Sequence, residues 1–305
     1  MSKSKVIVWG DCILDRYWFG QTSRISPEAP VPIVNVDNEN YRLGGAANVA
    51  MNLASLGMDV TFVSAIGDDA NGKIIKELLE KSNISFSGLK IKDFKTITKL
   101  RIYSYGQQMI RADFEDSNFR IEKEAIYDHI KSLFPENHFL VISDYDKGCI
   151  NSSQEVINEA KKHGLKVITD PKGKSYEKYR GTNYITPNMK EFTDFVGSFD
   201  CEDKLHKALK IFLENINSDG IILTMSEKGI LFYDKDHYHQ VPADVKEDVY
   251  DVTGAGDVVV ACFVRSLSEG KSPLDSVKIA NKVAGISVGH IGNYVAKKED
   301  MVLDD

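Results

Sequence analysis

The sequence has few cysteines and no metal-binding pattern of cysteine or histidine. Its four cysteines are widely spaced, with no Cys-x-x-Cys pair among 305 residues. This spacing indicates neither a zinc site nor a disulfide framework, so we expect free thiols. The seven histidines likewise lack the spacing of a metal site.

Long apolar runs and excess positive charge are also missing. The N-terminus leads only into the short apolar run 6–9, and no stretch approaches the roughly 20 apolar residues that a membrane-spanning helix needs. The formal net charge is -7, whereas neutralising nucleic-acid phosphates requires clustered lysine and arginine. We therefore expect a soluble, cytoplasmic protein with no nucleic-acid or membrane partner.

The chain alternates strand-like and helix-like segments along most of its length. With 42% hydrophobic residues, a chain of this size buries roughly 75% of its surface, and one domain over 1–305 is expected. The alternation predicts an α/β fold with a mostly parallel sheet covered by helices on both faces. Strands are predicted at 6–9, 60–66, 139–143, 166–169, 184–186, 221–225, 230–233 and 238–241. Helices are predicted at 46–56, 121–134, 152–163, near 188, and at 203–215, 255–267 and 273–290.

Two segments depart from this rhythm. Residues 96–103 alternate in polarity, residues 107–112 can return as a partner strand, and residues 31–36 form a proline-containing strand suited to a sheet edge. We expect a small β-sheet lid built from about 16–40 and 96–115. Exposed edges of such a lid can pair between chains, which makes a homodimer a reasonable hypothesis.

Residues 251–257, Asp-Val-Thr-Gly-Ala-Gly-Asp, lead directly into an apolar helix-like segment. The glycines let backbone N–H groups approach an anion, and the positive end of the helix points to the same place. Asp257 falls in the first helical turn. An anion site beside a carboxylate suits an enzyme that stabilises transferring phosphate while a base steers a hydroxyl. A glycine-rich turn capped by aspartate is the plain structural alternative.

This string resembles the signature of the ribokinase (PfkB) family of sugar kinases. The resemblance implies a ribokinase-like three-layer fold, with Asp257 as catalytic base and the amides of Gly254, Ala255 and Gly256 as the anion hole. It also implies ATP and Mg²⁺ as cofactors, with Thr253 beside the nucleotide, and it leaves dependence on a monovalent cation open.

Two further strings lie where this family holds its sugar. Asp11, Asp15 and Arg16 follow the first strand, where carboxylates can accept hydrogen bonds from sugar hydroxyls and arginine can pair with phosphate. A solvated loop is about as good an interpretation of these residues alone. By resemblance to the family, we favour the two aspartates as substrate ligands.

A second sugar-side string opens the first long helix. Gly44 and Gly45 permit close backbone approach, and Asn48 offers both a donor and an acceptor. The string resembles the family's Gly-Gly sugar-binding motif, whereas a plain turn and helix start is the alternative.

The nucleotide side is indicated by three weaker elements. Asn188 and Glu191 form an Asn-x-x-Glu string that also reads as a helix capping box, and both interpretations can hold together. By resemblance, Glu191 lies near the magnesium and acts on it through water. The other nucleotide-site candidates implied by the resemblance are Thr224, Ser226, Gly229 and Asn281.

Three basic residues are candidates for holding phosphate. Lys147 and Lys172 each follow a predicted strand beside a glycine, and Arg111 comes from the predicted lid. Each is weak alone, because solvated loop lysines are common. Together they can supply positive charge at the edge of the sheet where ligands bind in such folds.

The resemblance covers the whole chain and is closer at residues 14–20, 22–32 and 44–50. These are similar to the kinase part of the bacterial heptose enzymes, which phosphorylates the C1 hydroxyl of D-glycero-β-D-manno-heptose 7-phosphate. Trp9, Cys12 and Val258 depart from the family pattern. Another sugar phosphate and a non-catalytic sugar- or nucleotide-sensing module stay open. A dinucleotide dehydrogenase is disfavoured, because no Gly-x-Gly-x-x-Gly follows the first strand.

Overall fold

A nine-stranded sheet forms the centre of the protein in a computed structural model that describes residues 3–116, 119–151, 153–173, 175–244 and 249–303. Its order is β15-β14-β13-β12-β11-β10-β1-β4-β6. Adjacent strands are parallel from β6 to β13, and β14 and β15 add antiparallel at one edge. The strands are β1 (Lys5–Gly10), β4 (Asp59–Val63), β6 (Ser85–Phe86), β10 (Phe139–Ser143), β11 (Lys166–Asp170), β12 (Tyr184–Ile185), β13 (Gly220–Thr224), β14 (Ile230–Asp234) and β15 (Tyr238–Val241).

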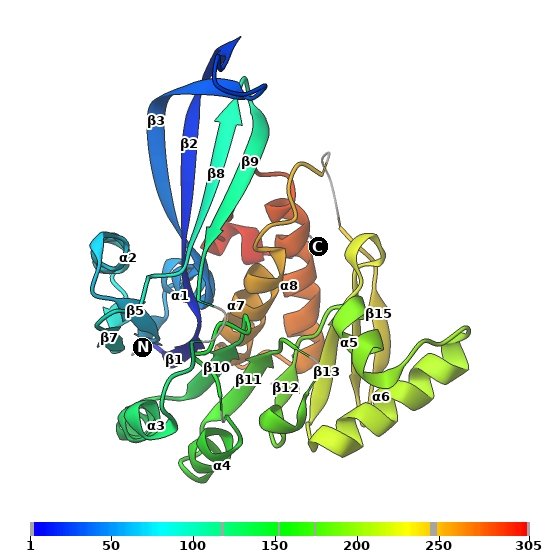
Figure 1. The fold of residues 1–305 in the computed structure, drawn as a ribbon. Coiled ribbons are helices and arrows are strands. Elements are labelled where there is room, and N and C mark those ends of the chain that lie inside the picture. Colours follow the sequence, from blue (N-terminus) through cyan, green and yellow to red (C-terminus); the bar gives the residue numbers. More distant parts are fainter. Residues whose placement is uncertain (1–2, 117–118, 152, 174, 245–248, 304–305) are drawn as a thin grey trace.

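Helices cover both faces of this sheet (Figure 1). One face is packed by α1 (Ala46–Ser55), α2 (Ala70–Lys81), α7 (Ala255–Ser268) and α8 (Pro273–Ser287). The other is packed by α3 (Lys123–Ser132), α4 (Gln154–Lys162), α5 (Met189–Val196) and α6 (Glu202–Ile216). The predicted three-layer α/β arrangement is therefore confirmed.

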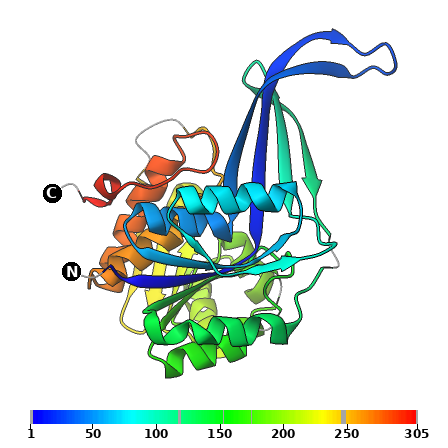
Figure 2. The same ribbon diagram turned by 90° about the vertical axis from the view of Figure 1, so that its left-hand side faces the viewer.

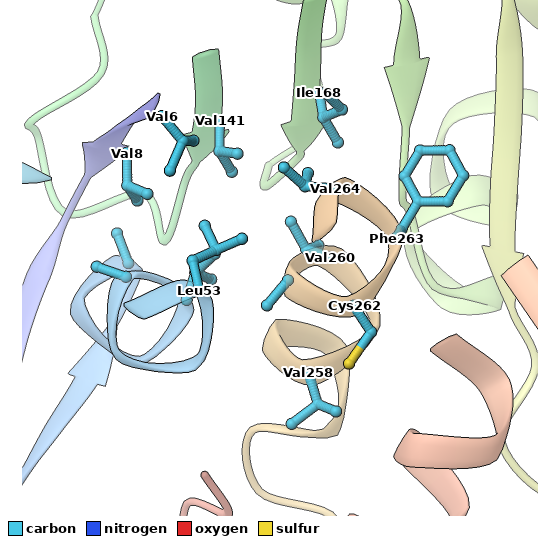
Figure 3. Close-up of a cluster of buried hydrophobic side chains, with 14 of the residues drawn as sticks. Val6, Val8, Leu53, Val141, Ile168, Val258, Val260, Cys262, Phe263 and Val264 are labelled. Atoms are coloured by element: carbon cyan, nitrogen blue, oxygen red, sulfur yellow. The ribbon is translucent and has the colours of Figure 1, made fainter. Parts of the chain in front are cut away.

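The core on the α1 and α7 side explains why the strands read as continuous apolar runs. Alternate residues of β1 point to opposite faces, so Val6 and Val8 meet Leu53 of α1, while Ile7 lies in the other core. Figure 3 shows this cluster, with Val260 of α7 packed among them. Both faces of β1 are therefore buried, and α7, the apolar segment that follows residues 251–257, packs in the same core as Val6 and Val8.

A second, four-stranded sheet projects from the main body (Figures 1 and 2). Its order is β3-β2-β8-β9, and β2 and β8 pair in parallel. We call it the lid sheet; its strands are β2 (Cys12–Ile25), β3 (Pro32–Gly45), β8 (Thr98–Ser104) and β9 (Gln107–Phe114). A two-stranded sheet of β5 (Ala65–Gly67) and β7 (Leu89–Ile91) lies near its base.

The lid sheet differs from the prediction in its extent. Its first part was predicted at about 16–40, but β2 begins at Cys12, and β3 continues to Gly45 at the start of α1. The reason is non-local, because residues 12–20 form a ladder with both β3 and β8. The edge position predicted for residues 31–36 is correct.

Smaller differences concern segment ends. The predicted strand 60–66 is two strands, β4 and β5, and the last predicted helix ends at Ser287 rather than at residue 290. The predicted helix start at residue 152 lies outside the described residues. Within the described ranges, no helix has the length and apolar character needed to cross a bilayer.

Candidate active site

Asp257 lies at the N-terminal end of α7 and is only 4% exposed. Its Oδ2 accepts a hydrogen bond from Asn48 Nδ2 at 2.7 Å, and its Oδ1 accepts one from the Tyr145 hydroxyl at 2.6 Å. Burial raises the pKa of Asp257 from 3.8 to about 6, although both hydrogen bonds act against that rise. A carboxyl with this pKa is ionised at neutral pH and can accept a proton.

The start of α7 is shaped by Gly254. This residue is the N-cap in the left-handed region (φ 77°), and a Cβ there would lie 2.8 Å from Asn48 Nδ2. Ala255 donates its N–H to the carbonyl of Val252 at 3.3 Å. Of the three predicted anion-hole amides, that of Ala255 is therefore engaged within the turn.

Asp15 lies on β2 where the lid sheet meets the main body. It is 4% exposed, and its Oδ1 accepts from Arg101 Nη1 at 2.6 Å. Its Oδ2 accepts from Asn293 Nδ2 at 3.0 Å. A Cβ on Gly44 would stand 2.3 Å from this Oδ2, so glycine at that position makes room for the carboxylate. The structure therefore brings together Asp15 and Gly44, two of the residues predicted to bind the sugar.

Asp11 has a different environment from the one expected of a sugar ligand. It is 1% exposed, and its carboxylate accepts backbone N–H groups of Tyr145, Lys147 and Cys149 at 2.9, 3.1 and 2.9 Å. Burial raises its pKa to about 6. In this conformation Asp11 holds the turn after β10 rather than facing a ligand. Its burial also shows that the plain alternative, a solvated loop, is wrong.

Arg16 does not join the predicted sugar site. Strand residues alternate between faces, so Arg16 points away from the side of the lid sheet that carries Asp15. Its guanidinium pairs with Glu39 and stacks on Trp18 and Tyr41. Its proximity to Asp15 in sequence gave no indication of this opposite orientation.

Of the three candidate phosphate-binding cations, two line the same cavity and the third lies on the lid sheet. Arg111 on β9 pairs with Asp113 at 2.9 Å, and Lys147 pairs with Glu115 at 2.8 Å. Lys172 pairs with Glu191 at 2.6 Å. Lys147 and Lys172 line one cavity of about 390 Å³, whereas Arg111 belongs to the lid sheet.

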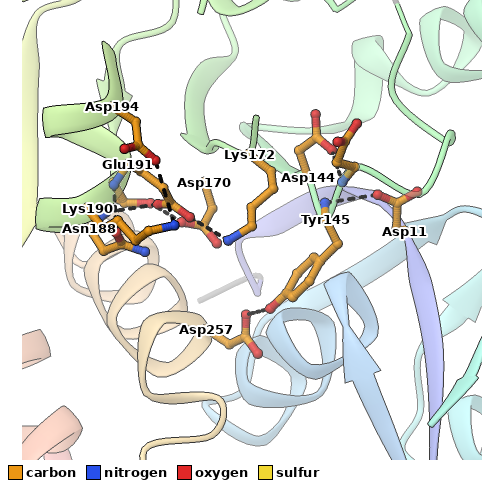
Figure 4. A network of polar contacts seen from close by, with 12 residues as sticks. Asp11, Asp144, Tyr145, Asp170, Lys172, Asn188, Lys190, Glu191, Asp194 and Asp257 are labelled. Atoms are coloured by element: carbon orange, nitrogen blue, oxygen red, sulfur yellow. Dashed lines mark hydrogen bonds and ion pairs between the residues drawn. The ribbon is translucent and has the colours of Figure 1, made fainter. Parts of the chain in front are cut away.

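The Asn-x-x-Glu element is a capping box. Asn188 Oδ1 accepts the Glu191 N–H at 2.9 Å, and Glu191 Oε2 accepts the Asn188 N–H at 3.0 Å. The other oxygen of Glu191 accepts from Lys172. Figure 4 shows this network beside Asp170, with Tyr145 linking the neighbouring turn to Asp257. Burial, reinforced by the charge of Asp257, raises the pKa of Asp170 well above its usual value.

The other predicted nucleotide residues lie on neighbouring elements. Thr224 ends β13 and pairs through its backbone with Asn188, which joins two of the predicted strings. Ser226 (φ 52°) and Gly229 (φ 84°) lie in the turn from β13 to β14. Thr253 bonds to Asp251, and the buried Asn281 donates to the Pro242 carbonyl at 2.8 Å. A larger hollow of about 1030 Å³, between α6 and the β14–β15 edge, contains none of these residues.

Sequence reasoning missed three side chains at the centre of the site: Tyr145, Arg101 and Asn293. Tyr145 was passed over in favour of the lysine two residues later. Alternation in residues 96–103 could have placed Arg101 on the same face as Asp15, given the pairing of β2 with β8. Nothing local marked Asn293, which follows α8 in an irregular segment.

Known proteins share both this sequence and this fold. The sequence pattern of the pfkB family carbohydrate kinases matches residues 3–299. The chain belongs to the pfkB family of carbohydrate kinases. It is 42% identical over 292 residues to bifunctional protein HldE of Proteus mirabilis, covering 95% of this chain and 61% of that protein. HldE of Haemophilus influenzae strain Rd is 43% identical over 293 residues, again with 95% and 61% covered. The chain thus spans about three-fifths of the length of these relatives.

Solved structures agree with the predicted ribokinase-like fold. Phosphofructokinase-2 from Escherichia coli in complex with potassium has a TM-score of 0.80 at 19% identity, covering 99% of this chain and 97% of that one. Ribokinase from Thermotoga maritima has a TM-score of 0.76 at 25% identity, with 98% of each chain covered. The pfkB assignment and the fold therefore support each other.

The carboxylates present suit Mg²⁺ held mainly by phosphates and water. In the described ranges no group of three or more His, Cys, Asp or Glu side chains could hold a metal. Magnesium in phosphoryl-transfer sites keeps several waters and uses one or two carboxylates together with substrate phosphates. Glu191 near the cavity of Lys172 is compatible with such a role.

Proposed function

We propose that this protein transfers a phosphoryl group from ATP to the C1 hydroxyl of D-glycero-β-D-manno-heptose 7-phosphate. The observation that carries the proposal is Asp257, a buried carboxylate with a pKa near neutrality at the N-terminus of α7. Membership in the pfkB family and the identity to HldE support a sugar kinase. The similarity of residues 14–20, 22–32 and 44–50 to heptose 7-phosphate kinases supports this particular sugar.

The sugar would lie between Asp257 and the lid sheet. Asn48 bonds to Asp257, and Asn293 bonds to Asp15, while Gly254 lies against both asparagines. A sugar hydroxyl bound by Asp15 is therefore close to the base. Asp11 contributes indirectly, through the turn that it holds.

A phosphate on the far end of the sugar would have cationic partners on the inner face of the lid sheet, the face that carries Asp15. Lys99 and Arg42 stand opposite Asp15 in the strand ladders, and Arg101 stands opposite Tyr17. Both arginines also stack on the Tyr17 ring. The planar guanidinium groups of the two arginines suit phosphate. Burial lowers the pKa of Lys99, but the two arginines keep this face positively charged. This face supports a phosphorylated sugar over an unphosphorylated one.

The nucleotide would lie on the other side of Asp257. Asn188, Lys172 and Glu191 border one cavity with Tyr145, and the turn at Ser226 and the helix residue Asn281 lie beyond them. Mg²⁺, when bound with ATP, would neutralise phosphate charge, with Glu191 acting through water. Lys172 is free to exchange its partner Glu191 for a phosphate oxygen.

The reaction then follows from the chain's own groups. Asp257 accepts the proton of the C1 hydroxyl as that oxygen attacks the γ-phosphorus, and the bond to the leaving ADP oxygen breaks in line. The amides of Gly254 and Gly256 and the dipole of α7 stabilise charge on the transferred group. Closure of the lid sheet over the sugar would exclude water and limit ATP hydrolysis.

An ATP-consumption screen tests the substrate. Heptose 7-phosphate, sedoheptulose 7-phosphate, fructose phosphates and ribose are compared, and the phosphorylated position is read by ³¹P NMR. We expect heptose 7-phosphate to be preferred, giving the 1,7-bisphosphate. Preference for ribose would refute the heptose assignment, and failure to consume ATP with every sugar would favour a sensing module.

A homodimer through the lid sheet is part of the proposal. The edge strand β9 exposes Ile110 and Phe114 to more than half of their maximum, and the opposite edge strand β3 exposes Val36. Apolar side chains beside unpaired backbone groups favour pairing with a second chain.

A further inference from the structure

Tyr145 lies between the proposed sugar side and the proposed nucleotide side of the site, and it contacts the proposed base, Asp257, directly. It follows β10 by two residues, and its hydroxyl donates to Asp257 Oδ1 at 2.6 Å. Burial and the negative charge of Asp257 raise the pKa of Tyr145 well above its usual value, so the hydroxyl remains protonated and acts as the donor. Figure 4 shows the ring reaching across from the turn to α7.

The turn that carries Tyr145 is held in one conformation. Asp11 accepts three of its backbone N–H groups, including that of Tyr145 itself. Asp144 accepts the N–H of Asp146, which has φ 56°. Gly148 has φ 97°, and a Cβ there would lie 2.1 Å from the Phe119 carbonyl oxygen. Such a constrained turn gives the tyrosine ring little freedom to move away from Asp257.

We propose that Tyr145 is a positioning residue for Asp257, fixing one carboxylate oxygen with its hydroxyl and thereby keeping the base ionised and aligned with the acceptor hydroxyl. Asn48 fixes the other oxygen, so the two donors set the carboxylate plane between them. Each oxygen has a further lone pair that can accept the sugar hydroxyl. This inference rests on the proposed function, because it assigns Tyr145 a part in the same proton transfer.

Other charged groups face Asp257 and stay in place when the hydroxyl is removed. Asp15 on β2 disfavours its ionisation and Lys99 on β8 favours it, whereas the pKa of Asp170 on β11 is itself raised by burial and by the charge of Asp257. Deleting the Tyr145 hydroxyl removes a donor to the ionised form and leaves these groups unchanged. A hydrogen bond to an ionised carboxylate stabilises the charged form, so the loss of one such bond should raise the carboxyl pKa by about one unit.

The test compares Tyr145→Phe with wild type and with a matched control. Tyr176→Phe is the control, since Tyr176 is fully buried and its hydroxyl has no hydrogen-bond partner among the described residues. In Tyr145→Phe we expect the acid limb of the kcat/KM profile to move upward by about one pH unit. Activity should fall about fivefold at pH 6, approach a tenfold loss below about pH 5, and recover toward wild type above pH 8. A purely structural role would give a loss that alkaline pH does not rescue.

A substrate-free measurement separates this inference from the proposed function. The carboxyl of Asp257 is titrated by ¹³C NMR in protein labelled at the aspartate carboxyls, with its signal assigned from Asp257→Asn. The inference requires a higher pKa in Tyr145→Phe than in wild type and in Tyr176→Phe, whatever sugar the protein uses. An unchanged titration, or an unchanged pH profile, would overturn it even if the heptose kinase activity is found.

Discussion

Replacing Asp257 by asparagine should stabilise the fold at neutral and alkaline pH while severely reducing turnover. The native pKa of Asp257 is about 6, against 3.8 for an ordinary aspartate. Because folding raises this pKa, the carboxyl contributes to the stability of the native state fully below about pH 3.8, and this contribution is lost as the pH rises through about 6. At neutral and alkaline pH the native state therefore contains a buried carboxylate whose ionisation opposes folding.

The magnitude follows from the difference between these two pKa values. At about 1.4 kcal/mol per pH unit, the ionised carboxylate costs about 3 kcal/mol at pH 8 and well under 1 kcal/mol at about pH 4. The asparagine side chain of the variant carries no charge; its Oδ1 can accept from Asn48, and its Nδ2 can donate to the Tyr145 hydroxyl oxygen. The free energy of unfolding of Asp257→Asn, relative to that of wild type, should thus increase by about 2 kcal/mol from pH 4 to pH 8.

Urea denaturation at both pH values measures this difference, and ATP binding serves as the control for an intact site. We expect turnover to fall by about 10² to 10⁴, the contribution of a positioned base, with ATP affinity largely retained. A variant that is equally destabilised at both pH values would show that the burial argument is wrong. Near-wild-type turnover would remove Asp257 from the role of base.

Three other changes test the remaining parts of the site. Arg101→Met should destabilise the protein by about 3–5 kcal/mol in urea denaturation, because it removes the cation that bonds the buried carboxylate of Asp15. Arg16→Met, on the outer face of the lid sheet, is the matched control and should have a much smaller effect. Glu191→Gln should raise the Mg²⁺ concentration needed for half-maximal activity by about tenfold, as loss of an outer-sphere partner does, and an unchanged Mg²⁺ titration would exclude Glu191 from metal binding. Ile110→Asp on the edge strand β9 should shift the protein from dimer to monomer in sedimentation analysis, whereas a monomeric wild type would refute the lid-mediated dimer.

Local sequence was sufficient for most of the α/β framework. Apolar runs such as residues 6–9 and 139–143 are buried on both faces, so they were recognisable as central parallel strands without any knowledge of their neighbours. The glycine string before α7 also indicated its own geometry, since Gly254 does adopt a positive φ at the helix N-cap. These features depend on backbone conformation and burial, which nearby residues largely fix.

Side-chain direction was harder to predict. Asp11, Asp15 and Arg16 are close in sequence, yet the structure sends them to three different environments: a backbone turn, the base of the lid sheet and its outer face. The reason is that residues 12–20 are a strand, whose successive side chains point to opposite sides. That strand exists only because β3 and β8 pair with it from distant parts of the chain.

By itself, the sequence determined the fold class, the position of the glycine-rich turn before α7 and the resemblance to sugar kinases, because these depend on short strings and on their periodicity. Only the tertiary structure decided which donors surround the carboxylates. Tyr145 and Asn48 meet at Asp257 across 112 and 209 residues, and Arg101 and Asn293 meet at Asp15 across 86 and 278. Such contacts arise where strand ends and helix starts converge at one edge of a sheet, and no local pattern encodes which side chains will face one another there.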